Sequence, residues 1–88
     1  MTETTTLDAV KAAVVEAAGI QARADSVDET TGLLGTMPEF DSLALVELLS
    51  MIEDRFGFEV DAMDVTPEVF ATVGTLRDYV NSHRPPGA

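Results

Sequence analysis

Residues 42–56 constrain the fold of this chain more than any other segment. Apolar side chains recur there at helical spacing, Asp41 or Ser42 can cap the start, and Gly57 can end the helix. The positions expected to face the core are Leu45, Val46, Leu48, Leu49, Ile52 and Phe56. A second stripe, expected to face solvent, holds Leu43, Glu47, Ser50 and Asp54. The segment therefore predicts a long helix with one buried and one exposed face.

A helix and a long loop are expected before this segment. The helix should run from about Leu7 to Ala18, with Thr6 as its N-cap and Gly19 just beyond its end. Residues 20–41 contain two glycines and one proline and show no sustained period, which is typical of a functional loop. Four apolar residues should pin this loop onto the helices: Leu33, Leu34, Met37 and Phe40.

Two further helices are expected after residue 57. Thr66, Pro67 and Glu68 have the order of an N-cap, a first helical proline and a first-turn acid, which predicts a short helix through about Phe70. Thr72 can cap a last helix whose inward residues are Val73, Leu76, Tyr79 and Val80. We therefore expect an all-α bundle of three longer helices and one short helix. Residues 7–80 would form the domain, with flexible ends at residues 1–6 and 81–88.

The charge of the chain narrows its partners. Sixteen acidic residues face five basic ones, so the net charge is -11. Such a surface repels nucleic acid and anionic membranes and should steer toward basic proteins. Composition alone is equally compatible with acidity that only keeps a small protein soluble. No secretory signal or membrane-length apolar run is present, so a cytoplasmic protein is expected. The protein is also expected to be a monomer. The chain has no cysteine, so a thiol that it needs must come from outside.

Ser42 stands where the long loop meets the long helix. Unpaired backbone N–H groups and the helix dipole favour negative charge at a helix N-terminus, so a phosphodiester on this serine would be stabilised. An Asp-Ser pair is also an ordinary helix cap, and taken alone it favours that simpler interpretation.

A wider pattern changes the balance between these two interpretations. It comprises Leu33-Leu34-Gly35, Met37 through Leu43, Val46-Glu47-Leu48, Ile52-Glu53 and Phe56-Gly57. This pattern resembles the acyl carrier protein family, in which a serine of an Asp-Ser-Leu motif begins the second of four helices. The resemblance implies 4′-phosphopantetheine on Ser42, attached by a phosphopantetheinyl transferase, with Asp41 and Leu43 as the flanking motif residues. The thiol of that arm would carry cargo as a thioester.

The resemblance also implies how partners dock. Leu43 would supply apolar contact beside the arm, and Glu47, Glu53 and Asp54 would supply charge. The partners would be the transferase and acyl-activating, synthase or transferase enzymes with basic patches. Glu39 stands where many family members have glycine, which leaves the pathway open among fatty-acid, polyketide and related biosynthesis.

Several alternatives remain beside this interpretation. The cargo could be an aminoacyl or peptidyl unit, and a protein of another class, an unmodified acidic adaptor, would also bind basic partners. Ser26, Ser50 and Ser82 are other hydroxyls without the motif. No catalytic residue is assigned, because no base or oxyanion motif accompanies Ser42. No metal site is expected either, since Glu59, Asp61 and Asp64 lack the spacing of a calcium loop and His83 is the only histidine.

The same helix predicts a route for long apolar cargo. A chain that folds back from Ser42 would first meet Val46, Leu49 and Ile52, which are expected to point inward. The residues expected opposite them are Phe40, Val65, Phe70 and Leu76. Short polar cargo should remain outside, because it gains little from apolar burial.

Overall fold

The computed structural model describes residues 6–20, 25–35 and 37–83. Its elements are α1 (Thr6–Ala18), α2 (Ser42–Phe56), the 3₁₀ helix η2 (Ala62–Asp64) and α3 (Val73–His83). Within the described residues the fold is thus all-helical, with three longer helices and one short helix, as predicted. Within the same residues no helix has both the length and the apolar content needed to cross a membrane.

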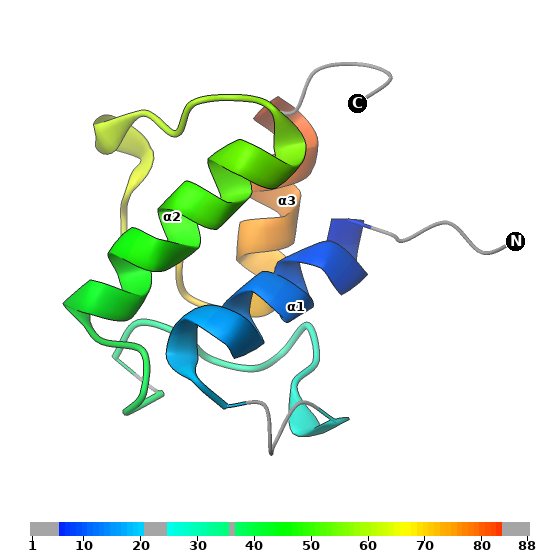
Figure 1. Ribbon diagram of the computed structural model, residues 1–88, viewed down its shortest axis with the longest axis vertical. Coiled ribbons are helices and arrows are strands. Elements are labelled where there is room, and N and C mark those ends of the chain that lie inside the picture. Colours follow the sequence, from blue (N-terminus) through cyan, green and yellow to red (C-terminus); the bar gives the residue numbers. More distant parts are fainter. Residues whose placement is uncertain (1–5, 21–24, 36, 84–88) are drawn as a thin grey trace, which may run out of the picture.

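The core lies between the three long helices, and α1 contacts both α2 and α3 (Figure 1). Its largest fully buried side chains come from all three helices and from two connecting segments. They are Val10, Val14, Leu33, Leu48, Ile52, Phe70, Val73, Leu76 and Val80. Each of the three long helices therefore turns an apolar face inward, and the bundle encloses one common core.

Helix α2 begins and ends where the sequence predicted. The Asp41 carboxylate accepts a hydrogen bond from the Ala44 N–H at 2.9 Å, which caps the first turn. Gly57 adopts a left-handed conformation with φ 73°, and its N–H donates to the Glu53 carbonyl. Asp41, rather than Ser42, is therefore the N-cap, and Ser42 is the first helical residue.

One position of the predicted buried face is wrong. Val46 is 60% exposed, whereas Leu48, Ile52 and Phe56 are buried and Leu45 and Leu49 are partly buried. At 3.6 residues per turn, Val46 lies nearly opposite Leu48 on the helix, so both cannot face the core. Ala44 occupies the missing buried position. The predicted cargo route thus loses Val46, while Leu49 and Ile52 remain on the inner side.

The long loop before α2 is tied to the segment before α3. The Leu33 N–H donates to the Ala71 carbonyl at 2.9 Å, and the Leu34 N–H donates to the Phe70 carbonyl at 3.1 Å. Two of the four predicted anchors are buried, with exposures of 0% for Leu33 and 4% for Phe40, and the other two are partly buried. Residues 31–35 of the loop therefore cross one end of the bundle and are held there by these bonds (Figure 1).

The short helix lies earlier in the chain than predicted. It occupies Ala62–Asp64, where Asp61 accepts a hydrogen bond from the Met63 N–H at 2.8 Å. Residues 66–70 form a single turn instead, closed by the Phe70 N–H to the Thr66 carbonyl at 3.1 Å. Pro67 and the Thr66 cap suit this turn equally well, so their pattern did not require a helix.

Helix α3 starts at Val73, directly after the predicted cap, and continues to His83. Its four predicted inward residues are all buried. The last three residues had been predicted to belong to the C-terminal tail, and Thr6, predicted to lie outside the first helix, begins α1. The remaining predicted ends, residues 1–5 and 84–88, lie outside the described residues.

The last turns of α3 are held by an aromatic cluster. The rings of Tyr79 and His83 lie 4.2 Å apart between centroids, and Phe58 lies 6.2 Å from each. The Tyr79 hydroxyl donates to the Asp64 carboxylate at 3.0 Å. Burial, aided by this negatively charged partner, raises the pKa of Tyr79 to about 12. The cluster fixes the segment that follows α2 against the end of α3.

Candidate functional site

Ser42 is exposed at the first turn of α2, at the end of the helix that the long loop leads into. The Asp41 side chain and carbonyl satisfy the N–H groups of Ala44 and Leu45, each at 2.9 Å. The N–H groups of Ser42 and Leu43 donate to no acceptor among the described residues. The turn therefore holds an exposed hydroxyl beside two open backbone donors.

These donors suit a phosphate ester on the Ser42 hydroxyl. Open N–H groups and the positive end of the helix dipole attract an anion, and the cap leaves both free. Asp41 is the nearest acid in the chain, and its side chain already holds the Ala44 N–H. The arrangement can bind and orient a phosphate, and no base within the described residues is hydrogen-bonded to the Ser42 hydroxyl.

The predicted docking acids fall into two groups. Glu47 and Asp54 are exposed on the outward stripe of α2 together with Leu43 and Ser50, as predicted. Glu53 is half-buried, and its carboxylate accepts a hydrogen bond from the Val60 N–H at 2.9 Å. Glu53 therefore fixes the chain that leaves α2, while Glu47 and Asp54 are open to solvent.

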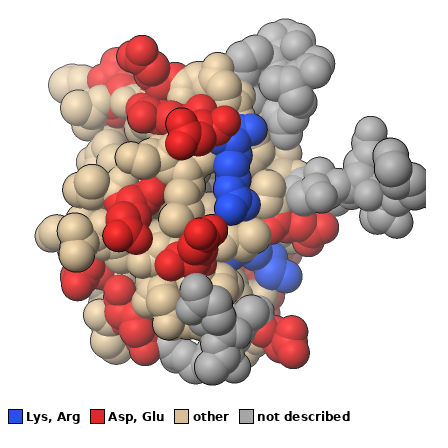
Figure 2. Space-filling view, viewed as in Figure 1, with Lys and Arg blue, Asp and Glu red and all other residues tan. Residues whose placement is uncertain are grey.

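Large apolar side chains are also exposed, two of them on α2. Leu43 is 69% exposed and Val46 is 60% exposed, and Met63 on η2 is 84% exposed. Sequence reasoning missed Val46, although its spacing of four residues from Ser42 places both on one face of α2. Figure 2 shows acidic side chains spread over this view of the molecule, with far fewer basic ones. Exposed apolar groups among acids are typical of a protein-binding surface.

The alternative serines have other surroundings. Ser50 is exposed in the middle of α2, and the Ser82 hydroxyl donates to the Asp78 carbonyl at 3.0 Å. Ser26 is exposed in the loop before α2. Neither Ser50 nor Ser82 begins a helix, so neither has the open donors that surround Ser42.

The acids considered for metal binding have structural contacts. Asp61 caps η2 and Asp64 accepts from the Tyr79 hydroxyl. Among the described residues, no group of three or more His, Cys, Asp or Glu side chains is placed to hold a metal ion. The His83 imidazole is partly exposed and stacks in the aromatic cluster, with Nδ1 2.9 Å from the Tyr79 carbonyl oxygen.

Comparisons with known proteins agree with this geometry. Residues 8–80 match the family described as "Phosphopantetheine attachment site". An acyl carrier protein of Lactobacillus acidophilus is 37% identical over 60 residues, which are 68% of this chain and 71% of that protein. One from Chlamydia caviae is 32% identical over 77 residues, covering 88% of this chain and 94% of the relative.

A solved structure extends the likeness to the fold. The solution structure of a holo acyl carrier protein from Nitrosomonas europaea superposes with a TM-score of 0.77 at 30% sequence identity. The match covers 86% of this chain and 92% of that one.

Proposed function

This chain belongs to the acyl carrier protein family, and we propose that Ser42 bears its 4′-phosphopantetheine arm. As a carrier, the chain holds acyl intermediates, and the thiol of the arm, when attached, supplies the thioester bond. The chain's own part is to present the attachment point, orient it and offer a surface to partner enzymes. We assign no catalytic step to the chain itself.

One observation carries the assignment to Ser42. Among the serines described above, it is the one that is exposed at a helix start beside two unoccupied backbone donors. The Asp41 cap fixes that start, and the Ser42 side chain is exposed there. A transferase can therefore reach it without unfolding any part of the bundle.

Incubation with coenzyme A and a permissive phosphopantetheinyl transferase tests this proposal. We expect intact mass spectrometry to show one added arm, and peptide mapping to place it on Ser42. Ser42→Ala should gain nothing, whereas Ser50→Ala, which also removes an exposed hydroxyl from α2, should be loaded like the unmodified chain. A chain that never gains the arm would instead be an acidic adaptor, and an arm on Ser26, Ser50 or Ser82 would refute the site.

We propose that partners dock on the outward stripe of α2. Leu43, with the neighbouring Val46, offers apolar contact beside the arm, and Glu47 and Asp54 offer negative charge. Glu53 belongs to the same proposal, although its contact with the Val60 N–H leaves less of it for a partner. The partners are the transferase and acyl-activating, synthase or transferase enzymes that present basic patches, and not nucleic acid or membranes.

The docking stripe is tested by reversing one charge. Glu47→Lys should slow loading several-fold at low salt and weaken its dependence on ionic strength, because the long-range attraction is reduced. Asp25→Lys makes the same change of charge on the loop and serves as the matched control. Equal loading rates for the two variants at every salt concentration would argue against this stripe.

Membership of the family indicates the class of cargo and of pathway, but not the individual cargo or pathway. We propose an acyl cargo in fatty-acid, polyketide or related biosynthesis, and an aminoacyl or peptidyl cargo is the alternative within the same class. A monomeric cytoplasmic protein with a carrier domain over residues 7–80 is consistent with its acidic surface. Mass spectrometry of the arm released from protein purified from its native cells would identify the cargo directly.

A further inference from the structure

A groove separate from the Ser42 end lies between the turn at residues 66–70 and α3. One wall is a single face of α3, whose residues 75, 78, 79, 82 and 83 have helical spacing. The turn supplies the other wall. The lining residues are Glu68, Val69, Thr75, Asp78, Tyr79, Ser82 and His83. This face of α3 thus combines an acid, hydroxyls and two rings, and a second acid faces it from the turn.

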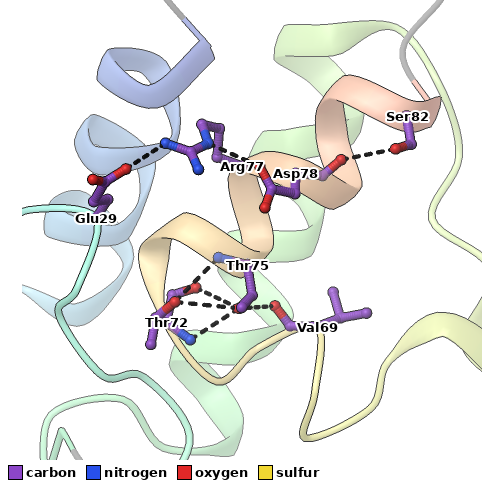
Figure 3. Close-up of polar contacts among 7 residues, drawn as sticks. All are labelled: Glu29, Val69, Thr72, Thr75, Arg77, Asp78 and Ser82. Carbon is purple, nitrogen blue, oxygen red and sulfur yellow. Dashed lines mark hydrogen bonds and ion pairs between the residues drawn. The ribbon is translucent and has the colours of Figure 1, made fainter.

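Short hydrogen bonds hold the walls of the groove (Figure 3). The Thr75 hydroxyl donates to the Val69 carbonyl at 2.9 Å, which fixes the turn against the helix. The Ser82 hydroxyl donates to the Asp78 carbonyl at 3.0 Å, so it is turned back on α3. The groove is therefore shaped before any ligand arrives, and filling it needs little rearrangement.

The two carboxylates of the groove retain free acceptor capacity. Asp78 accepts from Arg77 Nε at 3.1 Å through Oδ1, and its side chain is 69% exposed. Arg77 also pairs with Glu29 at 2.6 Å, so its charge is shared between two acids (Figure 3). Glu68 is exposed and makes no hydrogen bond or ion pair within the described residues. The groove therefore keeps an uncompensated negative charge beside the Tyr79 and His83 rings.

We propose that this groove binds the guanidinium group of an arginine side chain from a partner protein. A guanidinium is planar and can lie against an aromatic ring while it donates to carboxylates on either side. A lysine ammonium is more strongly hydrated and lacks that plane, so it should bind more weakly. The net charge of -11 favours a basic partner over an acidic one.

The end of the groove formed by Tyr79 and His83 lies far from Ser42. The contacts of Phe58 with Tyr79 and His83 place it beside the C-terminal end of α2, and α2 spans 15 residues. At 1.5 Å per residue, Ser42 is about 20 Å away. A partner enzyme that binds near Ser42 could therefore make a second contact in the groove, away from the thiol of the arm.

Titration of the full-length protein with N-acetyl-arginine amide, followed by amide NMR shifts, tests the proposal. We expect saturable shifts concentrated at Thr75, Asp78, Tyr79 and Ser82. N-acetyl-citrulline amide has nearly the same shape without the charge and should cause no saturable shift there. N-acetyl-lysine amide should bind several-fold more weakly. Equal shifts with citrulline, or shifts spread evenly over all acidic segments, would overturn the proposal.

Paired charge removal distinguishes the groove from the general field of the protein. Glu68→Gln with Asp78→Asn should weaken arginine binding at least several-fold. Asp25→Asn with Glu47→Gln removes the same charge elsewhere and should leave the saturable shifts in place. If the second pair weakens binding as much as the first, the effect is one of net charge and the groove is not a site. Both pairs are exposed, and an unchanged pattern of other amide shifts verifies the fold.

Discussion

The starts of α2 and α3 are built in opposite ways. At α3, the Val73 N–H donates to the Thr31 carbonyl at 3.0 Å and the Gly74 N–H donates to the Glu29 carbonyl at 2.8 Å. At α2, the corresponding first two N–H groups, of Ser42 and Leu43, find no acceptor among the described residues. The backbone of the long loop occupies the first N–H groups of α3 and leaves those of α2 open, so only the α2 start could receive an anion.

A side-chain cap alone does not determine whether the first two N–H groups of a helix are free to bind an anion. Both starts have a side-chain cap, Asp41 for α2 and Thr72 for α3, whose hydroxyl accepts from the Thr75 N–H at 3.1 Å. The caps satisfy only the later N–H groups of each first turn. Whether the first two N–H groups remain available depends on the loop, whose residues 29 and 31 bond to α3 although they are distant from it in sequence.

The largest effect is expected from adding a side chain at Gly74, where the loop backbone packs on the start of α3. A Cβ at position 74 would lie 2.9 Å from the Glu29 carbonyl oxygen, so Gly74→Ala must push the loop from α3. We expect a loss of about 1–3 kcal/mol in the free energy of unfolding, despite the better helix propensity of alanine. Urea denaturation measures it, and Asn81→Ala, exposed on the same helix, is the control. Loading of the folded Gly74→Ala protein should be unchanged, and a stability equal to that of the unmodified chain would contradict this packing.

The far end of α3 should respond to alkali. The folded protein raises the pKa of Tyr79 to about 12 from a usual value near 10, so the hydroxyl stabilises the fold fully below about pH 10. This contribution is lost as the pH rises from about 10 through about 12, because a tyrosinate would face the Asp64 carboxylate. Tyr79→Phe should cost about 1.5 kcal/mol at neutral pH, where it loses a hydrogen bond to a charged group.

The difference in stability between these two proteins should shrink as the pH rises from 10 to 12. Denaturant midpoints at a series of pH values measure it, and comparison within the pair cancels the titration of lysine and arginine. A constant difference over that range would show that the Tyr79 hydroxyl does not depend on its contact with Asp64.

Removing the two caps should separate stability from loading. Asp41→Ala and Thr72→Ala should each cost about 1 kcal/mol, the usual value for a lost N-cap. Only Asp41→Ala should also slow attachment of the arm, because it frays the turn that presents Ser42. Thermal melts and transferase rates on the same samples test this. Equal slowing by both variants would mean that general stability, and not the order of the α2 start, governs loading.

The smallest effect should come from placing a charge at the open start. Ser42→Asp puts a carboxylate beside the free N–H groups and should stabilise the fold by about 0.3–1 kcal/mol relative to Ser50→Asp. The second variant carries the same net charge in the middle of α2, so general repulsion is matched. The difference should diminish in high salt. If the two variants melt at the same temperature, the α2 start does not favour anions.

Local patterns predicted the helices well and the long-range contacts poorly. Asp41 and Gly57 act within their own turns, so the bounds of α2 could be predicted from the sequence. Val46 was misassigned because an apolar side chain was taken as a buried one, although its helical position opposes Leu48. The pattern at Thr66 and Pro67 fits a turn as well as a helix, so it could not place the short helix.

The candidate site shows the same division. The motif selected the Ser42 hydroxyl from adjacent residues but left the cap open between Asp41 and Ser42, and the structure makes Asp41 the cap. The sequence could not show that Glu53 is held by the Val60 N–H, since that bond depends on how the chain turns after Gly57. The groove along α3 was likewise not predictable, because Glu68 and Asp78 come to line one groove only when the turn packs on the helix.

The pairing of Leu33 with Ala71 also sets the order in which the chain can fold. Bringing these residues together closes a loop of about 40 residues, whose entropy is lost before the hydrogen bonds form, whereas each helix can form within its own segment. We therefore expect this pairing to form late, after α1, α2 and α3 have begun to pack. In hydrogen exchange, the Leu33 amide should report opening of the loop crossing, and the amide of Leu48 should exchange only when the whole bundle unfolds.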